Sequence, residues 1–133
     1  MNKKVSITDR VKSYEDACKE LGKEPIVDFG NDTIDEVAYK KLKTIIKALN
    51  EGWEPDWMDY NQLKYFNWFY IAHSGASAGF GFASTYYTAS HSYTLIGSRL
   101  CFKDEKTTIY ACGQFRDLYF EYLFIEMPKN YGK

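Results

Sequence analysis

Thirty-four consecutive residues of this chain, from Tyr65 to Ser98, include no Asp, Glu, Lys or Arg. Charged residues make up 26% of the chain, so about nine would be expected in a stretch of this length. The stretch instead combines Tyr, Phe and Trp with Ser, Thr, Gly, Asn and both histidines. Because aromatic and β-branched residues favour strands, this composition predicts a β-sheet whose surface carries no charge.

Three strands are predicted in and beside this stretch. They span 63–71, which is rich in strand formers, 79–87, in which large and small residues alternate, and 91–102, which has a glycine at position 97. Short polar links between them favour an antiparallel meander. Strict alternation in the second strand places its large residues on one face together with Ser84, and these are Phe80, Phe82 and Tyr86.

Capping signals before the uncharged stretch predict two helices. A Ser-x-x-Asp box at Ser13 and a glycine at position 22 bound the first helix. A Thr-x-x-Glu box at Thr33 begins the second helix, which ends before Gly52. Apolar residues at helical spacing, starting with Ile34, are expected to form the buried face of this second helix, and its lysines, which include Lys43 and Lys47, are expected to form a solvated face.

A last helix is predicted over 104–124 from the spacing of its apolar residues, among them Ile109. Gly113 inside it lowers helix stability, so it is expected to mark close packing against another backbone. The order ααβββα predicts an α+β fold, a three-stranded antiparallel sheet with helices packed on one face. A chain of 133 residues is long enough for one such domain, 1–133, in which 127–133 is expected to be a tail.

Two interpretations of the other sheet face remain open. A loop such as 53–62 can cover it, so that both faces are buried. Alternatively it is a recognition surface, because interface cores are depleted of charge and Tyr gives a large contact area at a low entropic cost. Lys64, Arg99 and Asp59 are then expected at its rim. The residues predicted to bind a partner are Tyr65, Trp68, Tyr70, Phe80, Phe82, Tyr86, Tyr87, Tyr93 and Arg99.

The charge balance sets further limits on partners and location. Seventeen basic residues face eighteen acidic ones, so the chain has no global field that would attract nucleic acid or an anionic membrane. No apolar run approaches the roughly 20 residues that span a bilayer, so no membrane partner is predicted. The N-terminal residues lack the apolar region of a signal peptide, and a cytoplasmic location is therefore expected.

The cysteines show no spacing typical of catalysis or metal binding. Cys18, Cys101 and Cys112 are an odd number without a C-x-x-C pair, and free thiols of this kind are generally buried. A nucleophilic cysteine would need a base such as His73 or His91, and neither is near a cysteine in the sequence. We therefore expect three small apolar side chains in or near the core.

One segment matches a catalytic motif in its residue types. Residues 75–79 read Gly-Ala-Ser-Ala-Gly, the pattern of a nucleophile elbow, but a strand is predicted after them where the elbow needs a helix. No acid lies between Ser77 and His91, so the order serine, acid, histidine is missing. Neither histidine has a ligand at metal-binding spacing. The sequence predicts no enzyme, no metal site and no cofactor.

Five segments of the chain carry a family resemblance. They are similar to a family of small uncharacterised proteins carried by phages and mobile elements of gut Bacteroides-type bacteria. The chain departs from that family at Asn67, where the family has proline, and at 112–113, where Cys-Gly replaces Gly-Lys. The segments span 8–17, 48–57, 64–70, 97–103 and 114–119.

The resemblance implies a mobile-element setting, in which small proteins without enzymatic activity often act by binding. We therefore expect a non-catalytic protein that acts on a host or defence (CRISPR-type) protein complex through its uncharged aromatic sheet, as an anti-CRISPR-like inhibitor. A homodimer through the sheet face is a further possibility. Alternatives are a virion accessory or structural protein and a single-stranded nucleic-acid-binding protein. Nucleic acid is not favoured, because base-stacking surfaces are paired with a basic groove and this stretch has none.

Overall fold

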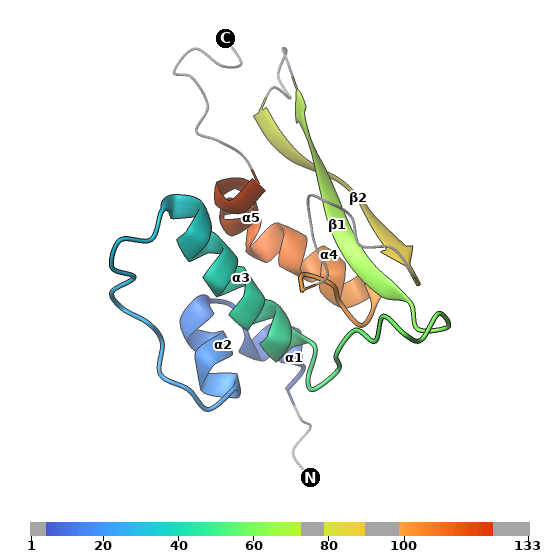
Figure 1. Ribbon diagram of the computed structural model, residues 1–133, viewed down its shortest axis with the longest axis horizontal. Helices are drawn as coiled ribbons and strands as arrows, with labels where there is room; N and C mark the ends of the chain where they lie inside the picture. Colours follow the sequence, from blue (N-terminus) through green and yellow to red (C-terminus); the bar gives the residue numbers. More distant parts are fainter. Residues whose placement is uncertain (1–4, 73–78, 90–98, 124–133) are drawn as a thin grey trace.

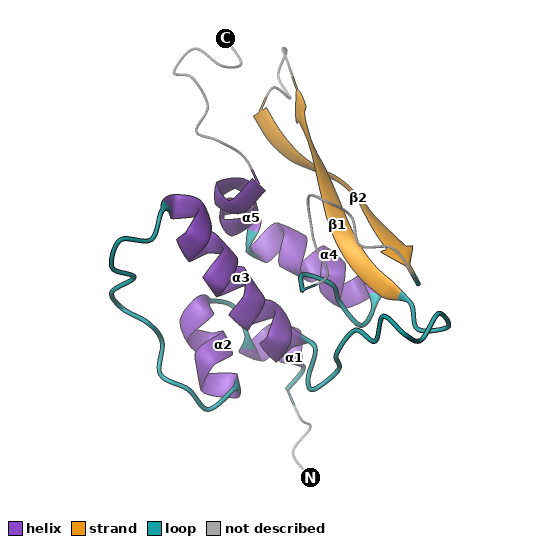
Figure 2. Ribbon diagram, in the orientation of Figure 1, coloured by secondary structure: helices purple, strands orange, loops and turns teal. Residues whose placement is uncertain are grey.

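A computed structural model describes residues 5–72, 79–89 and 99–123 of the chain. Figures 1 and 2 show the helices gathered on one side of a β-hairpin. The described residues form a mixed arrangement of helices and a small sheet, so the predicted α+β class is confirmed. In chain order the elements are α1 (Ile7–Arg10), α2 (Tyr14–Glu20), α3 (Ile34–Leu49), β1 (Lys64–Ala72), β2 (Gly79–Thr88), α4 (Glu105–Gln114) and α5 (Arg116–Leu123).

The first two predicted helices begin at their predicted caps. The Ser13 hydroxyl accepts a hydrogen bond from the Asp16 backbone N–H at 3.0 Å, at the start of α2. At the start of α3, the Thr33 backbone N–H donates to the Glu36 carboxylate at 3.0 Å. Gly22 follows α2 with a φ of +69°, a left-handed conformation that glycine adopts without steric cost. Both helices are therefore confirmed at the positions that the capping signals indicate.

β1 and β2 form an antiparallel pair, but a register shift lies between Trp68 and Phe69. Phe82 pairs with Phe69 of β1, and Tyr86 pairs with Phe66. Positions 66 and 69 lie on opposite sides of the pleat, because successive residues of a strand alternate. The register shift therefore interrupts the regular backbone pairing between Phe82 and Tyr86 that uninterrupted alternation in the second strand assumes.

A three-stranded sheet is not shown. Most of the predicted third strand, 91–102, lies outside the described residues, and the sheet that the structure describes has two strands. The described end of this segment makes a single antiparallel bridge to β1. In that bridge the Phe102 N–H donates to the Tyr65 carbonyl at 2.7 Å, and the Tyr65 N–H donates to the Phe102 carbonyl at 3.0 Å.

The single last helix predicted over 104–124 is two helices, α4 and α5, which meet at Phe115. Phe115 has φ −116° and ψ 28°, outside the helical region. The break allows two directions of packing, because α4 contacts the hairpin and α5 contacts α3. Gly113 does not mark a close approach, since a β-carbon built there would meet nothing within 4 Å, and that expectation is wrong.

The main core lies between the helices and the start of β1. Burial of the predicted α3 stripe is confirmed except at Ile34, whose side chain is 67% exposed at the helix N-terminus. Ile109 of α4 is also exposed, against expectation. The core residues include Val11, Ala17, Leu42, Ile45, Leu49, Phe66, Phe102 and Tyr119.

A buried asparagine, Asn50, joins the C-terminus of α3 to the segment that follows the uncharged stretch. Its side-chain N–H donates to the Cys101 carbonyl, and its side-chain oxygen accepts from the Lys103 N–H, both at 3.0 Å. Asn50 is 4% exposed, so water does not compete for these bonds. Because Phe102 pairs with Tyr65, the same amide also sets the position of α3 relative to β1.

A second buried asparagine, Asn67, links β1 to its two neighbours. Its side-chain N–H donates to the Thr108 carbonyl of α4 at 2.8 Å. Its oxygen accepts from the Thr85 hydroxyl of β2 at 2.9 Å. The Tyr119 hydroxyl lies among these buried groups without a hydrogen-bond partner of good geometry, and burial raises the pKa of Tyr119. The contact between helix layer and hairpin is therefore specified by polar groups as well as by apolar packing.

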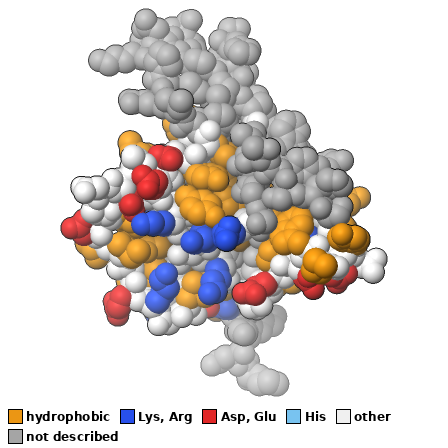
Figure 3. Space-filling model, in the orientation of Figure 1, with side chains coloured by type: hydrophobic (Ala, Val, Ile, Leu, Met, Phe, Trp, Pro, Cys, Tyr) orange, Lys and Arg blue, Asp and Glu red, His pale blue; other side chains and the backbone are white. Residues whose placement is uncertain are grey.

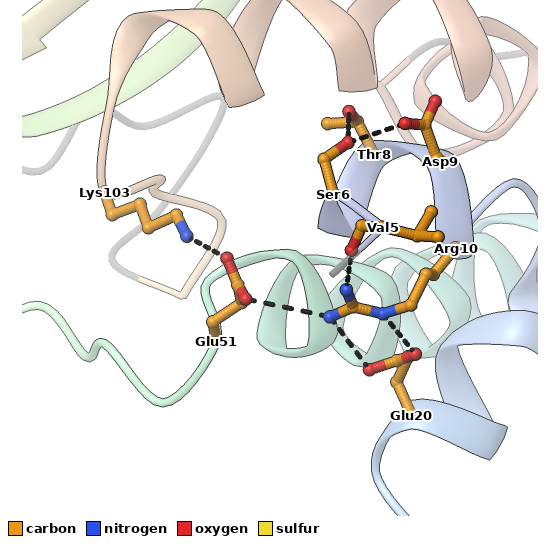
Figure 4. A network of polar contacts seen from close by, with 8 residues as sticks. All are labelled: Val5, Ser6, Thr8, Asp9, Arg10, Glu20, Glu51 and Lys103. Carbon is orange, nitrogen blue, oxygen red and sulfur yellow. Dashed lines mark hydrogen bonds and ion pairs between the residues drawn. The ribbon is translucent and has the colours of Figure 1, made fainter. Parts of the chain in front are cut away.

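A network of ion pairs joins α1, α2 and the end of α3 near the surface, as Figure 4 shows. The Arg10 Nε lies 2.8 Å from a Glu20 carboxylate oxygen, and Arg10 also lies 3.7 Å from Glu51. Glu51 pairs in turn with Lys103 at 2.7 Å. These side chains are partly exposed, and ion pairs of this kind contribute about 1 kcal/mol or less each. The buried Asn50 bonds are therefore the stronger constraint on this junction.

Replacing Asn50 with alanine is expected to lower the free energy of unfolding by about 2–4 kcal/mol, because it leaves a buried carbonyl and N–H without partners. Urea unfolding followed by circular dichroism measures this change. Asn61→Ala is the matched control, since Asn61 is exposed and should change stability by about 0.5 kcal/mol or less. Equal stability of the two variants would contradict the role assigned to Asn50.

Candidate functional site

Among the nine residues predicted to bind a partner, the structure describes the side chains of Tyr65, Tyr87 and Arg99. It brings the two tyrosines together across the hairpin, with ring centroids 5.9 Å apart and planes inclined by 51°. Tyr87 is 55% exposed and Tyr65 is half-buried. Tyr93 lies outside the described residues, as do the side chains of Trp68, Tyr70, Phe80, Phe82 and Tyr86.

The segment that leads into β1 exposes further large apolar side chains. Met58, Tyr60 and Leu63 are 88%, 68% and 41% exposed. The backbone of this segment is held against the hairpin, because the Lys64 ammonium donates to the Asp59 carbonyl at 2.9 Å. The partly exposed tyrosine pair therefore lies close in the chain to a loop that exposes several large apolar side chains.

Lys64 is buried, although it was expected at the rim of the sheet surface. Its side chain is fully enclosed, and its ammonium also donates to the Ala89 carbonyl at 3.0 Å. The same ammonium lies 5.1 Å from the centroid of the Trp57 ring. Two carbonyls and an aromatic face thus replace water around this charge. Lys64 and Asn67 lie on opposite sides of the pleat, and both are buried. The start of β1 is therefore covered on both faces.

A cavity of about 450 Å³ lies between the C-terminal half of α3 and the segments 53–57 and 99–101. Figure 3 shows basic side chains grouped over α3, flanked by hydrophobic ones over the segment between α3 and β1. The cavity combines both kinds of side chain. Its charged and aromatic lining residues are Lys43, Lys47, Trp53, Glu54, Trp57 and Arg99.

Local geometry explains why the chain forms this cavity. Lys43 and Lys47 are four residues apart on α3 and therefore lie on one face, one turn apart. After α3 the chain turns through Gly52, whose φ of +87° suits only glycine, and the Trp53 N–H bonds to the Asn50 carbonyl at 2.9 Å. The hydrogen bond from the Asn50 side chain to the Cys101 carbonyl brings the opposite wall into place.

The lining holds cations that are not neutralised within the described structure. Lys47 and Arg99 form no ion pair with any residue that the structure describes. The Lys43 ammonium lies 5.5 Å from the Tyr39 ring, a contact that leaves its charge uncompensated. The solvated face expected for the α3 lysines is correct in position, but two of them also line a cavity.

The described cysteines are poor nucleophiles. Cys18, Cys101 and Cys112 are all buried, which confirms their predicted place in the core. Burial raises the pKa of the Cys101 thiol to about 11 and that of Cys112 to about 12, so both stay protonated at neutral pH. Residues 73–78 and 91, which include Ser77 and both histidines, lie outside the described residues. No cluster of three possible metal ligands occurs in the part of the chain that the structure describes.

Comparison of the chain with models of protein families, with curated proteins and with solved structures found no match. No described helix is both long enough and apolar enough to cross a membrane. The tyrosine pair and the basic cavity are therefore the two features of the molecule from which a function can be inferred.

The three thiols are expected to resist labelling in the folded protein, because each is buried and the folded state favours the protonated form of Cys101 and Cys112. Dithionitrobenzoate should react slowly with the native chain and with all three thiols after unfolding in urea. Raising the pH from neutral to about 9 should accelerate labelling of the unfolded chain much more than labelling of the native chain. Fast labelling of native Cys101 or Cys112, located by peptide mass spectrometry, would contradict this assignment.

Proposed function

We propose that this chain is a non-catalytic binding protein of a phage or mobile element that acts on a host or defence protein complex through the aromatic surface of its hairpin. The observation that carries the proposal is the Tyr65–Tyr87 pair, which stands partly exposed at the end of a strand pair whose one Lys, Arg, Asp or Glu is the buried Lys64. Exposed aromatic rings in an uncharged setting are typical of the centre of a protein interface. The family resemblance supplies the mobile-element setting.

Two further observations support a protein partner. Tyr60 and Met58 add exposed apolar area to the loop that leads into the hairpin. Monomeric proteins rarely leave large apolar patches uncovered unless they bind something there. The buried, high-pKa thiols support a non-catalytic role, because they do not offer a thiolate at neutral pH.

Tyr87→Ala is expected to weaken partner binding at least about tenfold, as removal of a central aromatic anchor usually does. The loss of its ring contact with Tyr65 should cost only about 1 kcal/mol of stability. The measurement is capture of host proteins from a lysate of Bacteroides-type cells by the tagged chain, with quantitative mass spectrometry. A CRISPR-type interference assay with and without the chain then tests whether the captured complex is inhibited.

Ile34→Ala is the matched control, because Ile34 is also an exposed large apolar residue but begins α3 and belongs to neither strand of the hairpin. It should capture the same complex as the wild-type chain. A folded Tyr87→Ala variant that binds and inhibits as well as wild type would contradict the proposal. A large drop in its melting temperature would also contradict it, since the ring would then belong to the core. Recovery of the chain in purified particles would favour the virion alternative.

A further inference from the structure

We propose that the cavity between α3 and the segments 53–57 and 99–101 binds a nucleotide unit, one base that carries a terminal phosphate monoester. This inference goes beyond the proposed function, which uses the hairpin and not the cavity. The volume of about 450 Å³ lies within the range of pockets that hold small ligands, roughly 300–1,000 Å³.

The phosphate is indicated by the cations of the lining. Neither Lys47 nor Arg99 has a carboxylate partner among the described residues. The four ion pairs among those residues are made by other basic side chains, those of Arg10, Lys40 and Lys103. Arginine presents a planar fork that matches two phosphate oxygens, and lysine contributes a compact charge. Lys43, one turn before Lys47, is a third basic residue of the lining, and its ammonium lies over the Tyr39 ring.

The charge of the lining favours a single phosphate monoester. The described lining residues include three basic side chains and one carboxylate, Glu54, which gives a formal net charge of +2. A phosphate monoester carries between −1.5 and −2 at neutral pH, which these charges balance, as the second phosphate pKa is about 6. Diphosphates and triphosphates bring more negative charge than the lining compensates, and Glu54 would repel the excess. Glu54 can accept a hydrogen bond from the amino group of a base.

The base is indicated by the two indole rings. Trp53 and Trp57 both line the cavity and are both half-buried. Aromatic side chains of this kind bind bases by stacking, which depends little on base identity. The Lys64 ammonium holds the Trp57 ring in place, and Lys64 itself is fixed by two carbonyls.

Isothermal titration calorimetry of the full chain with adenosine monophosphate tests the proposal, with adenosine as the ligand that lacks only the phosphate. Adenosine should bind at least about tenfold more weakly. Lys47→Gln and Arg99→Gln should each weaken binding of the monophosphate about tenfold. Lys106→Gln is the matched control, because Lys106 is exposed on α4 and does not line the cavity. Equal binding of adenosine and its monophosphate, or equal losses in all three variants, would overturn the proposal.

The stacking half of the proposal has its own test. Trp53→Leu should weaken binding of adenosine monophosphate about tenfold, whereas Trp53→Phe should retain most of it. The same pair of substitutions at Trp57 checks the second wall, with circular dichroism to confirm folding, since Trp57 also contacts Lys64. If inorganic phosphate binds as tightly as the nucleotide, or if the leucine variants bind normally, the cavity does not recognise a base.

A nucleotide unit of this kind can come from a free nucleotide or from the end of a single-stranded nucleic acid. A short oligodeoxynucleotide with a 5′-phosphate, compared with the same strand without it, separates the two sources. Tighter binding of the phosphorylated strand than of the monophosphate would assign the site to a nucleic-acid end, and the reverse would assign it to a free nucleotide. Tyr87→Ala should leave both affinities unchanged, so the outcome does not depend on the hairpin surface.

Discussion

The side-chain amide of Asn50 is the point at which the helices and the hairpin are joined. It binds a carbonyl and an N–H that lie two residues apart, at Cys101 and Lys103, with both bonds at 3.0 Å. The residue between them, Phe102, pairs with Tyr65 of β1. One amide therefore determines how far the end of α3 lies from the first strand. An ionised carboxylate of this length can accept a hydrogen bond but cannot donate one, and an apolar side chain can neither donate nor accept. Only an amide of this length makes both bonds.

The same junction produces both candidate surfaces. By holding Cys101 against α3, Asn50 places Arg99 opposite the lysines of that helix and so closes the basic cavity. By fixing Phe102, it positions the strand that carries Tyr65. Lys64 then connects the two regions, because its ammonium contacts both the hairpin end at Ala89 and the cavity wall at Trp57. The cavity and the tyrosine pair share one support, although they suit ligands of different chemistry.

Features determined by neighbouring residues could be predicted from the sequence, and features determined by distant contacts could not. At Ser13 the side-chain hydroxyl accepts a hydrogen bond from a backbone N–H three residues later, and at Thr33 the backbone N–H donates to a carboxylate three residues later. Both bonds are local, so both helix starts were predictable. The break at Phe115 depends on α4 and α5 packing against different partners. The hairpin bulge near Phe69 likewise depends on pairing between strands, which residue alternation does not report.

The candidate site shows the same division. Arg99 was identified from sequence as a basic residue beside an aromatic stretch, whereas Lys43 and Lys47 were interpreted as a solvated helix face. That face differs from an ordinary solvated helix face because the turn after α3 places Trp53 and Trp57 beside it. The available signal was a pair of lysines four residues apart, followed within ten residues by a glycine turn and two tryptophans around Pro55.

The uncharged stretch also explains where the charges of this chain must act. Every Lys, Arg, Asp and Glu lies outside 65–98, so Lys64, the first residue of β1, is the one such residue in the two strands. Its ammonium is stabilised by two backbone carbonyls and the Trp57 ring. Across the border, the cations on α3 and Arg99 face a cavity whose lining includes one acid, Glu54. The excess of positive charge in the cavity is therefore local, and it arises where charged segments of the chain border the uncharged stretch. It exists although the net charge of the whole chain is −1, so composition alone could not reveal it.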